Sequence, residues 1–258
     1  MGGYPIPASL VSDMYYYSGR FANKELVFGF HDPETVSFFH GDLKKTCSNG
    51  NAVIIPEKDV NEWMSCWNVR DYSYAEYVIS CSCTCDWLMH EGCVVFHGAS
   101  MLWNGRVYLF SAPSGTGKTT QIRLWQRLFP TEMTILNGDK PILDISHKSE
   151  VRIFPSPWKG KEGYGRDDIV GPLGGIILLR QAMKNDIALM KPSEAAKNLF
   201  GRICSTFNMT EDVLNAAEIV EKIVTVVPVW LLYNKGDEDS ALLTHTILEK
   251  EYEACITD

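Results

Sequence analysis

Two apolar runs, 93–102 and 106–111, are joined through Asn104-Gly105 and lead directly into the glycine-rich segment APSGTGKTT, residues 112–120. This arrangement constrains the fold more than any other feature. Asn-Gly between apolar runs is the strongest short-range signal of a β-hairpin, because a type I′ turn needs positive φ at both positions. The strand before the glycine-rich segment therefore has an antiparallel neighbour. We predict an α/β fold with a mixed, partly antiparallel sheet.

The turn also determines which residues face each other across the hairpin. Counting outward pairs Trp103 with Arg106 and places His97 opposite Ala112, at the start of the glycine-rich segment. This makes His97 a candidate site residue. A buried strand histidine bonded to the backbone is the alternative interpretation.

The segment 112–120 follows the phosphate-binding pattern G-x-x-x-x-G-K-[ST] except at its first position. Glycines let the backbone N–H groups wrap a phosphate, and the start of the following helix carries a partial positive charge. Lys118 can reach the β- and γ-phosphates, and the Thr119 hydroxyl can bind Mg²⁺. The residues expected around the nucleotide are Ser114, Gly115, Thr116, Gly117, Lys118, Thr119 and Thr120.

Ala112 stands where the pattern has its first glycine. Pro113 pushes Ala112 towards an extended conformation with negative φ, which alanine adopts without strain. The departure is therefore compatible with a working loop, and we predict that ATP binds there with Mg²⁺ or Mn²⁺.

A metal-bound phosphate also needs a carboxylate at the end of a nearby strand. The strand in MTILNGD supplies Asp139, which we expect to act with Thr119 as metal ligand, to serve as general base, or both. A simple turn at this position is the alternative. We expect this strand to lie beside the strand 106–111, because a helical crossover returns the chain to a parallel position. An ionised Asp139 should then favour the charged form of His97.

These motifs together resemble a known superfamily. SGTGKTT followed by a strand ending in NGD, with FHG on the antiparallel strand before the loop, is similar to the HPr kinase/phosphorylase and ATP-dependent PEP carboxykinase superfamily, and to its small HPr-kinase-like members. The resemblance covers about 93–158 well and implies a P-loop kinase core of that type. In HPr kinases the His of a His-Gly pair upstream of the loop lies close to the phosphates, and His97-Gly98 matches this pair. The superfamily commonly has an Asp pair where this chain has Gly138-Asp139.

The segment WKGKEGYGR is a glycine-rich, basic loop that carries Lys159, Lys161 and Arg166. A cation on such a loop can close over a γ-phosphate in the transition state. Lys161 is the first candidate, since its neighbour Gly160 permits close approach. A solvated basic loop is the alternative.

The favoured function is an ATP-dependent kinase that moves the γ-phosphoryl group to a hydroxyl of a protein or peptide serine, or of a small molecule. One alternative is a regulatory module that binds ATP with little or no transfer, because the first Asp of the pair is missing. A carboxykinase-like enzyme is less favoured, because the chain looks short and no convincing set of Lys, His and Arg residues for a C4 acid is found.

The net charge and the cysteine spacing argue against several classes of partner and against a zinc site. The net charge of −8 and a pI near 5.3 argue against nucleic acid or a membrane surface as partners. Cys81, Cys83, Cys85 and Cys93 lack the spacing of a zinc site, and we expect them to pack as reduced thiols. The N-terminal segment lacks the pattern of a signal peptide, so we expect a cytoplasmic protein.

We expect two regions, a strand-rich N-terminal region 1–92 with one helix across 73–92, and a nucleotide-binding core 93–258. A hairpin of 25–31 with 35–41 is expected in the first. In the second, helices are expected to follow Ser193 and Thr210 as N-caps, and strands to cover 174–180 and 226–233.

Overall fold

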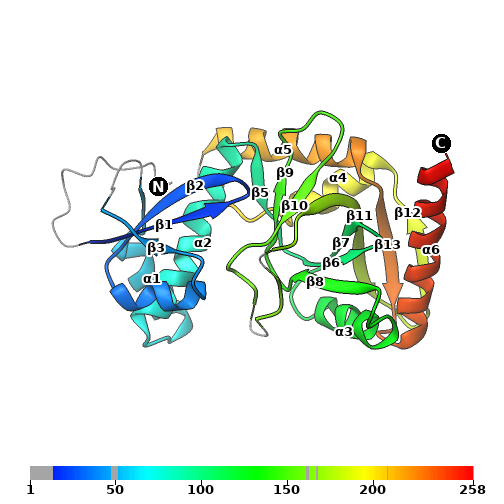
Figure 1. Ribbon diagram of the computed structural model, residues 1–258, viewed down its shortest axis with the longest axis horizontal. Coiled ribbons are helices and arrows are strands. Elements are labelled where there is room, and N and C mark those ends of the chain that lie inside the picture. Colours follow the sequence, from blue (N-terminus) through cyan, green and yellow to red (C-terminus); the bar gives the residue numbers. More distant parts are fainter. Residues whose placement is uncertain (1–13, 48–51, 161–162, 167, 208, 258) are drawn as a thin grey trace.

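The computed structural model describes residues 14–257, except 48–51, 161–162, 167 and 208. The chain forms two parts that lie side by side along the long axis, with the N-terminal lobe in blue and cyan in Figure 1. The larger part is a sheet with helices on both of its faces. Within the described residues no helix is long and apolar enough to cross a membrane.

The N-terminal lobe has a four-stranded sheet with the order β3-β1-β2-β4. Its elements are β1 (Tyr15–Phe21), β2 (Lys24–Phe30), the 3-10 helix η2 (Pro33–Phe39), β3 (Lys44–Lys45), β4 (Val53–Ile54), α1 (Glu57–Trp67) and α2 (Tyr72–His90). The turn between β1 and β2 is Ala22-Asn23, and both residues have positive φ, as a type I′ hairpin requires.

Two expectations for this lobe are wrong. The predicted hairpin of 25–31 with 35–41 does not form, because Asp32 caps η2 by accepting from the Glu34 N–H and Pro33 starts the helix. The segment 57–67, expected among strands and turns, is the helix α1, which follows Pro56 and has Glu57 and Asp59 in its first turn. The predicted helix across 73–92 is confirmed as α2.

The larger sheet has nine strands, and its main order is β5-β9-β10-β11-β7-β6-β8, with β13 on β11 and β12 on β13. Its strands are β5 (Cys93–Val95), β6 (Ala99–Trp103), β7 (Arg106–Ser111), β8 (Met133–Asn137), β9 (Ile142–Asp144), β10 (Arg152–Phe154), β11 (Gly171–Gln181), β12 (Asp186–Leu189) and β13 (Val229–Asn234). β7 pairs antiparallel with β6 and parallel with β11. The predicted mixed sheet is confirmed.

The predicted register of the Asn104-Gly105 hairpin is confirmed from Trp103–Arg106 through Ala99–Phe110. The predicted strand 93–102, however, is two strands. The ladder with β7 ends at Ala99, and β5 pairs instead with β9. His97 therefore has no ladder partner in β7, although the Ser111 hydroxyl donates to its carbonyl at 2.7 Å.

The predicted place of the strand before Asp139 is wrong. β8 pairs antiparallel with β6, at the edge of the sheet, and does not contact β7 as a neighbouring strand. The reason is that the tight hairpin has already placed β6 on that edge of β7. The crossover through α3 therefore passes over β6 before the chain enters the sheet again.

Helices cover both faces of this sheet. α3 (Lys118–Leu128) and α6 (Glu238–Thr257) lie on one face, and α4 (Pro192–Phe200) and α5 (Thr210–Val226) on the other (Figure 1). Alternate residues of β7 pack against the helices on opposite faces of the sheet. Tyr108 and Phe110 belong to the cluster with α3 and α6, and Val107 and Leu109 belong to the cluster with α5. The caps are Lys191 for α4 and Met209 for α5 rather than the predicted Ser193 and Thr210.

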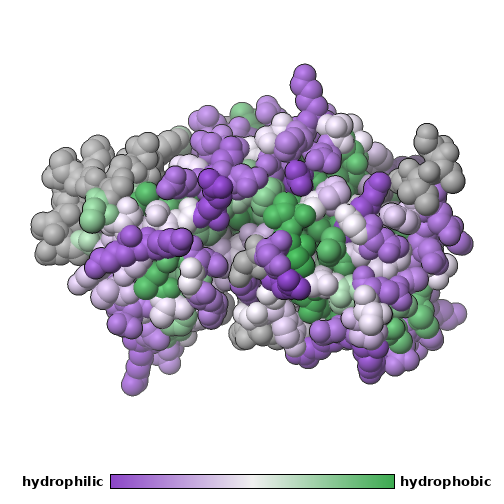
Figure 2. All heavy atoms as spheres, in the orientation of Figure 1, coloured by the Kyte–Doolittle hydropathy of each residue, from purple (hydrophilic) through white to green (hydrophobic). Residues whose placement is uncertain are grey.

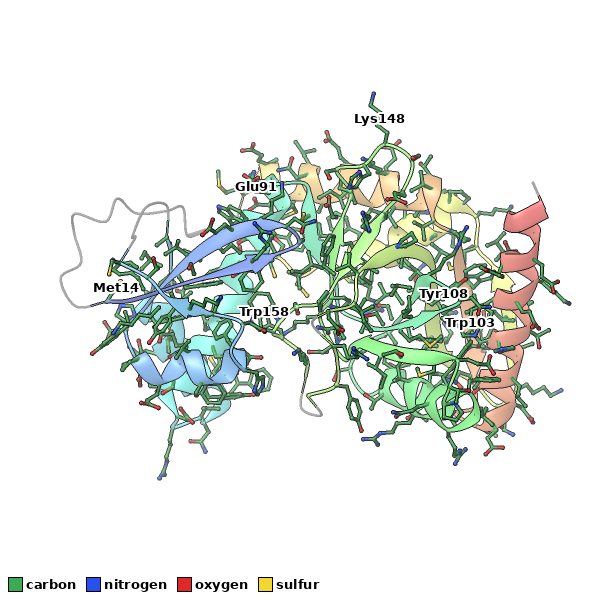
Figure 3. The ribbon with its side chains drawn as sticks, viewed as in Figure 1. Met14, Glu91, Trp103, Tyr108, Lys148 and Trp158 are labelled. Atoms are coloured by element: carbon green, nitrogen blue, oxygen red, sulfur yellow. The ribbon has the colours of Figure 1, made fainter. Side chains whose placement is uncertain are left out.

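The apolar core of the N-terminal lobe continues into the larger part. Phe28, Phe30 and Phe39 belong to the same buried cluster as Ile142 and Trp158. Trp158 lies at the junction of the two parts in Figure 3. A division of the chain into 1–92 and 93–258 stays a prediction, since this cluster draws residues from both sides of the boundary.

Candidate functional site

A cavity of about 780 Å³ separates the glycine-rich loop from the N-terminal lobe. The two parts of the molecule meet at an indentation in the space-filling view (Figure 2). One side, the core wall, is formed by His97, Ser114, Gly115, Gly117, Lys118, Thr119, Thr120, Gly138, Asp139, Lys140, Trp158 and Gly160. The other side, the aromatic wall, is formed by Phe38, His40, Trp63, Tyr74, Tyr77 and Val78. The core wall thus includes six of the seven residues expected around a nucleotide.

The glycine-rich loop has two glycines in the left-handed conformation. β7 ends at Ser111 and α3 begins at Lys118, with Gly115 at φ +76° and Gly117 at φ +115°. Both angles are in the left-handed range that favours glycine. Ala112 has no such angle and is 1 % exposed, packed in the cluster with α3. The alanine therefore fits its position, as expected from Pro113.

Lys118 is folded back onto its own loop. Its Nζ donates to the Ala112 carbonyl at 2.9 Å and to the Pro113 carbonyl at 3.5 Å. Burial lowers the pKa of the ammonium, and Asp139 opposes this effect. An anion in the loop would raise the pKa of Lys118 again, because a negative charge favours the ammonium form.

Asp139 is positioned by the end of β8. The buried Asn137 accepts from the N–H groups of Asp139 at 2.9 Å and of Lys140 at 2.8 Å. The Asn137 amide in turn donates to the Ser156 carbonyl at 3.0 Å. Asn137 is thus a positioning residue, because its side-chain oxygen and nitrogen both make hydrogen bonds to the protein backbone.

The predicted proximity of His97 and Asp139 is confirmed. His97 Nε2 lies 3.5 Å from Asp139 Oδ1, and the Gly98 N–H donates to the Asp139 carbonyl at 2.8 Å. The two side chains come from segments on opposite sides of the loop and meet in the cavity, where both are about one quarter exposed.

Asp139 raises the pKa of His97 as expected, but the expected net preference of His97 for its charged form is wrong. The pKa of His97 is lowered, first by burial and then by the nearby Lys118, and both effects outweigh the attraction of Asp139. Lys118 was omitted from the sequence argument, although it lies in the same cavity. The lowered pKa favours the neutral form of His97.

Gly138 has no room for the acidic residue common in the superfamily. A Cβ atom at this position would lie 2.8 Å from the Lys159 carbonyl oxygen and 3.3 Å from the Tyr164 side chain. The backbone of the basic loop is packed too closely against Gly138 for any larger residue. The packing therefore leaves room for one carboxylate here, that of Asp139.

The described part of the basic loop brings fewer cationic side chains to the cavity than expected. Lys161 lies outside the described residues. Lys159 is buried, and Arg166 makes an exposed ion pair with Asp168 at 2.6 Å. Gly160, at φ +77°, lines the cavity, and a Cβ there would lie 3.0 Å from the Asp139 Cβ. The loop backbone therefore closes over Asp139.

Sequence reasoning missed Lys140. Its Nζ lies 4.0 Å from Asp139 Oδ2, and the side chain lines the cavity. The pKa of this ammonium is raised, first by the neighbouring Cys81 and further by Asp139, against the effect of burial. A second cation thus faces the cavity, and its only sequence signal was its position directly after Asp139.

The expected burial of the four clustered cysteines is confirmed. Cys81, Cys83, Cys85 and Cys93 are buried free thiols, and Cys81 and Cys85 lie on one face of α2 with 4.0 Å between their sulfur atoms. Burial raises the pKa of Cys83 and of Cys93 to about 12, so these thiols stay protonated. The described residues contain no group of three or more His, Cys, Asp or Glu side chains placed to hold a metal ion.

The aromatic wall was also missed. Phe38 stacks on Tyr77 with 5.5 Å between the ring centroids, and Trp63 meets Tyr74 edge-on at 6.2 Å. The rings come from η2, α1 and α2, which are separate in sequence. No local motif connects them, so only the tertiary structure brings them together.

Comparison with known proteins gives little. No protein-family model matches the sequence, and no curated protein matches it. Among solved structures, the HPr(Ser) kinase/phosphatase from Coxiella burnetii is similar at 10% identity and a TM-score of 0.36, over 64% of this chain and 99% of that one. The function proposed below therefore rests on the geometry of the cavity.

Proposed function

We propose that this protein is a phosphotransferase that moves the γ-phosphoryl group of ATP to a hydroxyl. The observation that carries the proposal is the meeting of Lys118, Asp139 and His97 in one cavity, beside a loop whose glycines have the required positive φ. A phosphate-binding loop alone supports nucleotide binding. A carboxylate and an imidazole facing the same space add the groups that proton transfer needs.

The loop would hold the phosphates through its backbone. The N–H groups of 114–119 and the start of α3 provide dipoles directed at an anion, and Lys118 would leave the Ala112 carbonyl for the β- and γ-phosphates. Thr120 lines the cavity next, where the α-phosphate would lie.

The side chains fit a divalent cation with oxygen ligands. Thr119 and Asp139 both line the cavity, and the Asp139 carboxylate is 29 % exposed, so it is accessible to a ligand. Mg²⁺ prefers such ligands together with phosphate oxygens and water, and Mn²⁺ accepts the same set. When bound, the cation would neutralise charge on the β- and γ-phosphates.

Asp139 is the proposed general base. Its carboxylate would take the proton of the attacking hydroxyl, while a ring N–H of His97 would donate to the same carboxylate and hold its orientation. Lys140 and the proposed Lys161 would stabilise charge on the transferred group.

One observation favours a second candidate, a module that binds ATP with little or no transfer. The packing around Gly138 excludes the second carboxylate, so metal binding and proton abstraction both fall to Asp139. A single group performs both tasks less well than two. An acceptor that becomes phosphorylated, whether a small protein, a peptide or a small molecule, would distinguish the transferase from the binding module.

The test is to incubate the protein with γ-labelled ATP and Mg²⁺, with and without serine-containing peptides and small alcohols. Labelled acceptor supports the transferase, and Lys118→Ala abolishes the label. Tight ATP binding with no label on any acceptor supports the binding module. Absence of ATP binding in the wild-type protein would refute both.

A further inference from the structure

The aromatic wall lies across the cavity from the groups that would act on the γ-phosphate. The pKa of Tyr77 is raised mainly by burial, and Lys140 and Asp139 are among the charged groups close enough to contribute. The Tyr77 hydroxyl also donates to the Pro157 carbonyl, which precedes the cavity residue Trp158, at 3.1 Å. The wall and Asp139, the proposed base for the attacking hydroxyl, therefore line the same cavity close to each other.

The wall offers its ligand almost no charge. Among the described lining residues, the N-terminal lobe contributes no carboxylate, ammonium or guanidinium group, and His40 is its one titratable side chain besides the two tyrosines. A substrate recognised by a carboxylate or a phosphate of its own would need cations on this side. The wall therefore disfavours an anionic group, which it could not pair.

The rings are accessible and held in place. Tyr74 is 37 % exposed and Trp63 is half-buried, while the fully buried Phe39 supports Tyr77 edge-on at 5.3 Å between centroids. Trp and Tyr present a large contact area with few rotatable bonds, so ordering them on binding costs little entropy. Such a surface suits a flat ring, which stacks on or meets these rings edge-on.

We propose that the aromatic wall binds the phosphoryl acceptor, and that this acceptor is an alcohol with an uncharged aromatic ring beside its hydroxyl, such as a serine next to an aromatic side chain. This inference rests on the proposed transferase function. In the reaction, the acceptor oxygen forms a bond to the γ-phosphorus, the bond from that phosphorus to the β–γ bridging oxygen breaks, the hydroxyl proton passes to Asp139, and ADP leaves.

The experiment measures binding, so that it does not depend on transfer. Acetyl-Ser-Phe-amide and acetyl-Ser-Ala-amide are titrated by calorimetry into the full chain in the presence of Mg²⁺ and ADP. We expect the phenylalanine peptide to bind at least tenfold more tightly. Trp63→Leu should remove this preference. Trp67→Leu should keep it, because Trp67 lies one turn further on α1, is 69 % exposed and does not line the cavity. If Trp63→Leu unfolds the protein, Tyr74→Leu replaces it.

Two results would overturn the inference. Equal affinity for both peptides in the wild-type protein would exclude recognition of a ring. A loss of ADP affinity in Trp63→Leu would show that the wall binds the nucleobase and not the acceptor. If the ring preference holds and depends on Trp63, but no phosphopeptide forms with ATP, the binding inference stands and the transferase function fails.

Discussion

The two walls of the cavity differ in how they are built. Most of the core wall comes from the loop 114–120 and from the segment 138–140, and it carries the charged groups Lys118, Asp139 and Lys140. The aromatic wall comes from three elements of the N-terminal lobe and is nearly uncharged. One cavity thus combines a charged surface with an apolar one. In the proposed function, catalysis would depend on the core wall and acceptor choice on the aromatic wall.

This division makes a general prediction. Changes in the core wall should affect nucleotide binding and transfer for every acceptor, while changes in the aromatic wall should alter the choice of acceptor and leave nucleotide binding intact.

Lys118→Ala should reduce transfer at least about 1000-fold and weaken ATP binding, because the loop loses its only side-chain cation towards the β- and γ-phosphates. Equilibrium binding of ATP with Mg²⁺ and single-turnover transfer measure the two effects. Lys184→Ala, at an exposed lysine outside the cavity, is the control and should change neither. Normal ATP affinity in Lys118→Ala would remove the loop from the site.

Asp139→Asn should slow transfer about 100- to 1000-fold and leave most of the ATP affinity, because the amide keeps the shape but cannot take a proton. Rapid-quench measurement of phosphopeptide formation gives the rate. Asp168→Asn is the matched control, since that carboxylate is exposed and pairs with Arg166 outside the cavity. A wild-type rate in Asp139→Asn would exclude it as the base.

Gly138→Asp introduces the acid common in the superfamily, yet it should lower the free energy of unfolding by about 1–3 kcal/mol and not increase transfer. The reason is the contact of 2.8 Å that its Cβ would make with the Lys159 carbonyl. Urea denaturation measures the change. Gly201→Asp is the control, because a Cβ at Gly201 meets nothing within 4 Å. A faster enzyme of unchanged stability would show that Gly138 is not constrained by packing.

ATP binding should take up a proton through His97. The pKa of His97 lies below 6.5 in the empty protein, and the phosphates would raise it, so ATP affinity increases as the pH falls through the interval between the two values. The gain is about tenfold for each unit of pKa increase. Calorimetry in buffers of different ionisation enthalpy counts the protons. His97→Gln should lose this part of the uptake, and an unchanged proton count in that variant would contradict the assignment.

Tyr77→Phe should cost about 1 kcal/mol, because it leaves the Pro157 carbonyl without the hydroxyl that links α2 to the core wall. We expect nucleotide binding to be unchanged and the preference for aromatic acceptors to weaken slightly. Thermal denaturation and the peptide titrations measure these effects. Tyr74→Phe, at a more exposed ring, is the control. A loss of ATP affinity in Tyr77→Phe would contradict the separation of the two walls.

The core wall could be predicted where local chemistry determines structure. Gly115 and Gly117 have the positive φ that the glycine-rich pattern predicts, and the Asn104-Gly105 turn determines the register of its hairpin. The position of β8 could not be predicted by counting crossover residues, because β6 competes for the same sheet edge. The charge of His97 does not follow from its pairing with Asp139 alone, because burial and three cations, Lys118, Lys140 and Arg202, act on the ring together.

The aromatic wall could not be predicted at all. Phe38 lies in a segment with the composition of a strand, and its role depends on the cap that Asp32 provides for η2. Trp63 lies in a helix that was not expected. Each ring has an ordinary local setting, and only the packing of three elements gives them a shared surface.

The Asn104-Gly105 hairpin has a consequence for folding and for the width of the site. A hairpin forms in about 1–10 μs, whereas the pairing of β7 with β11 must first close the long segment from Ser111 to Gly171. We therefore expect β6 to occupy one edge of β7 early, which leaves β8 the outer edge of β6. Neighbouring strands are about 4.8 Å apart, so the inserted strand sets β7 and β8 about 10 Å apart. The hairpin thus acts as a spacer, and we expect it to fix the separation between the ends of β7 and β8, after which the glycine-rich loop and Asp139 follow.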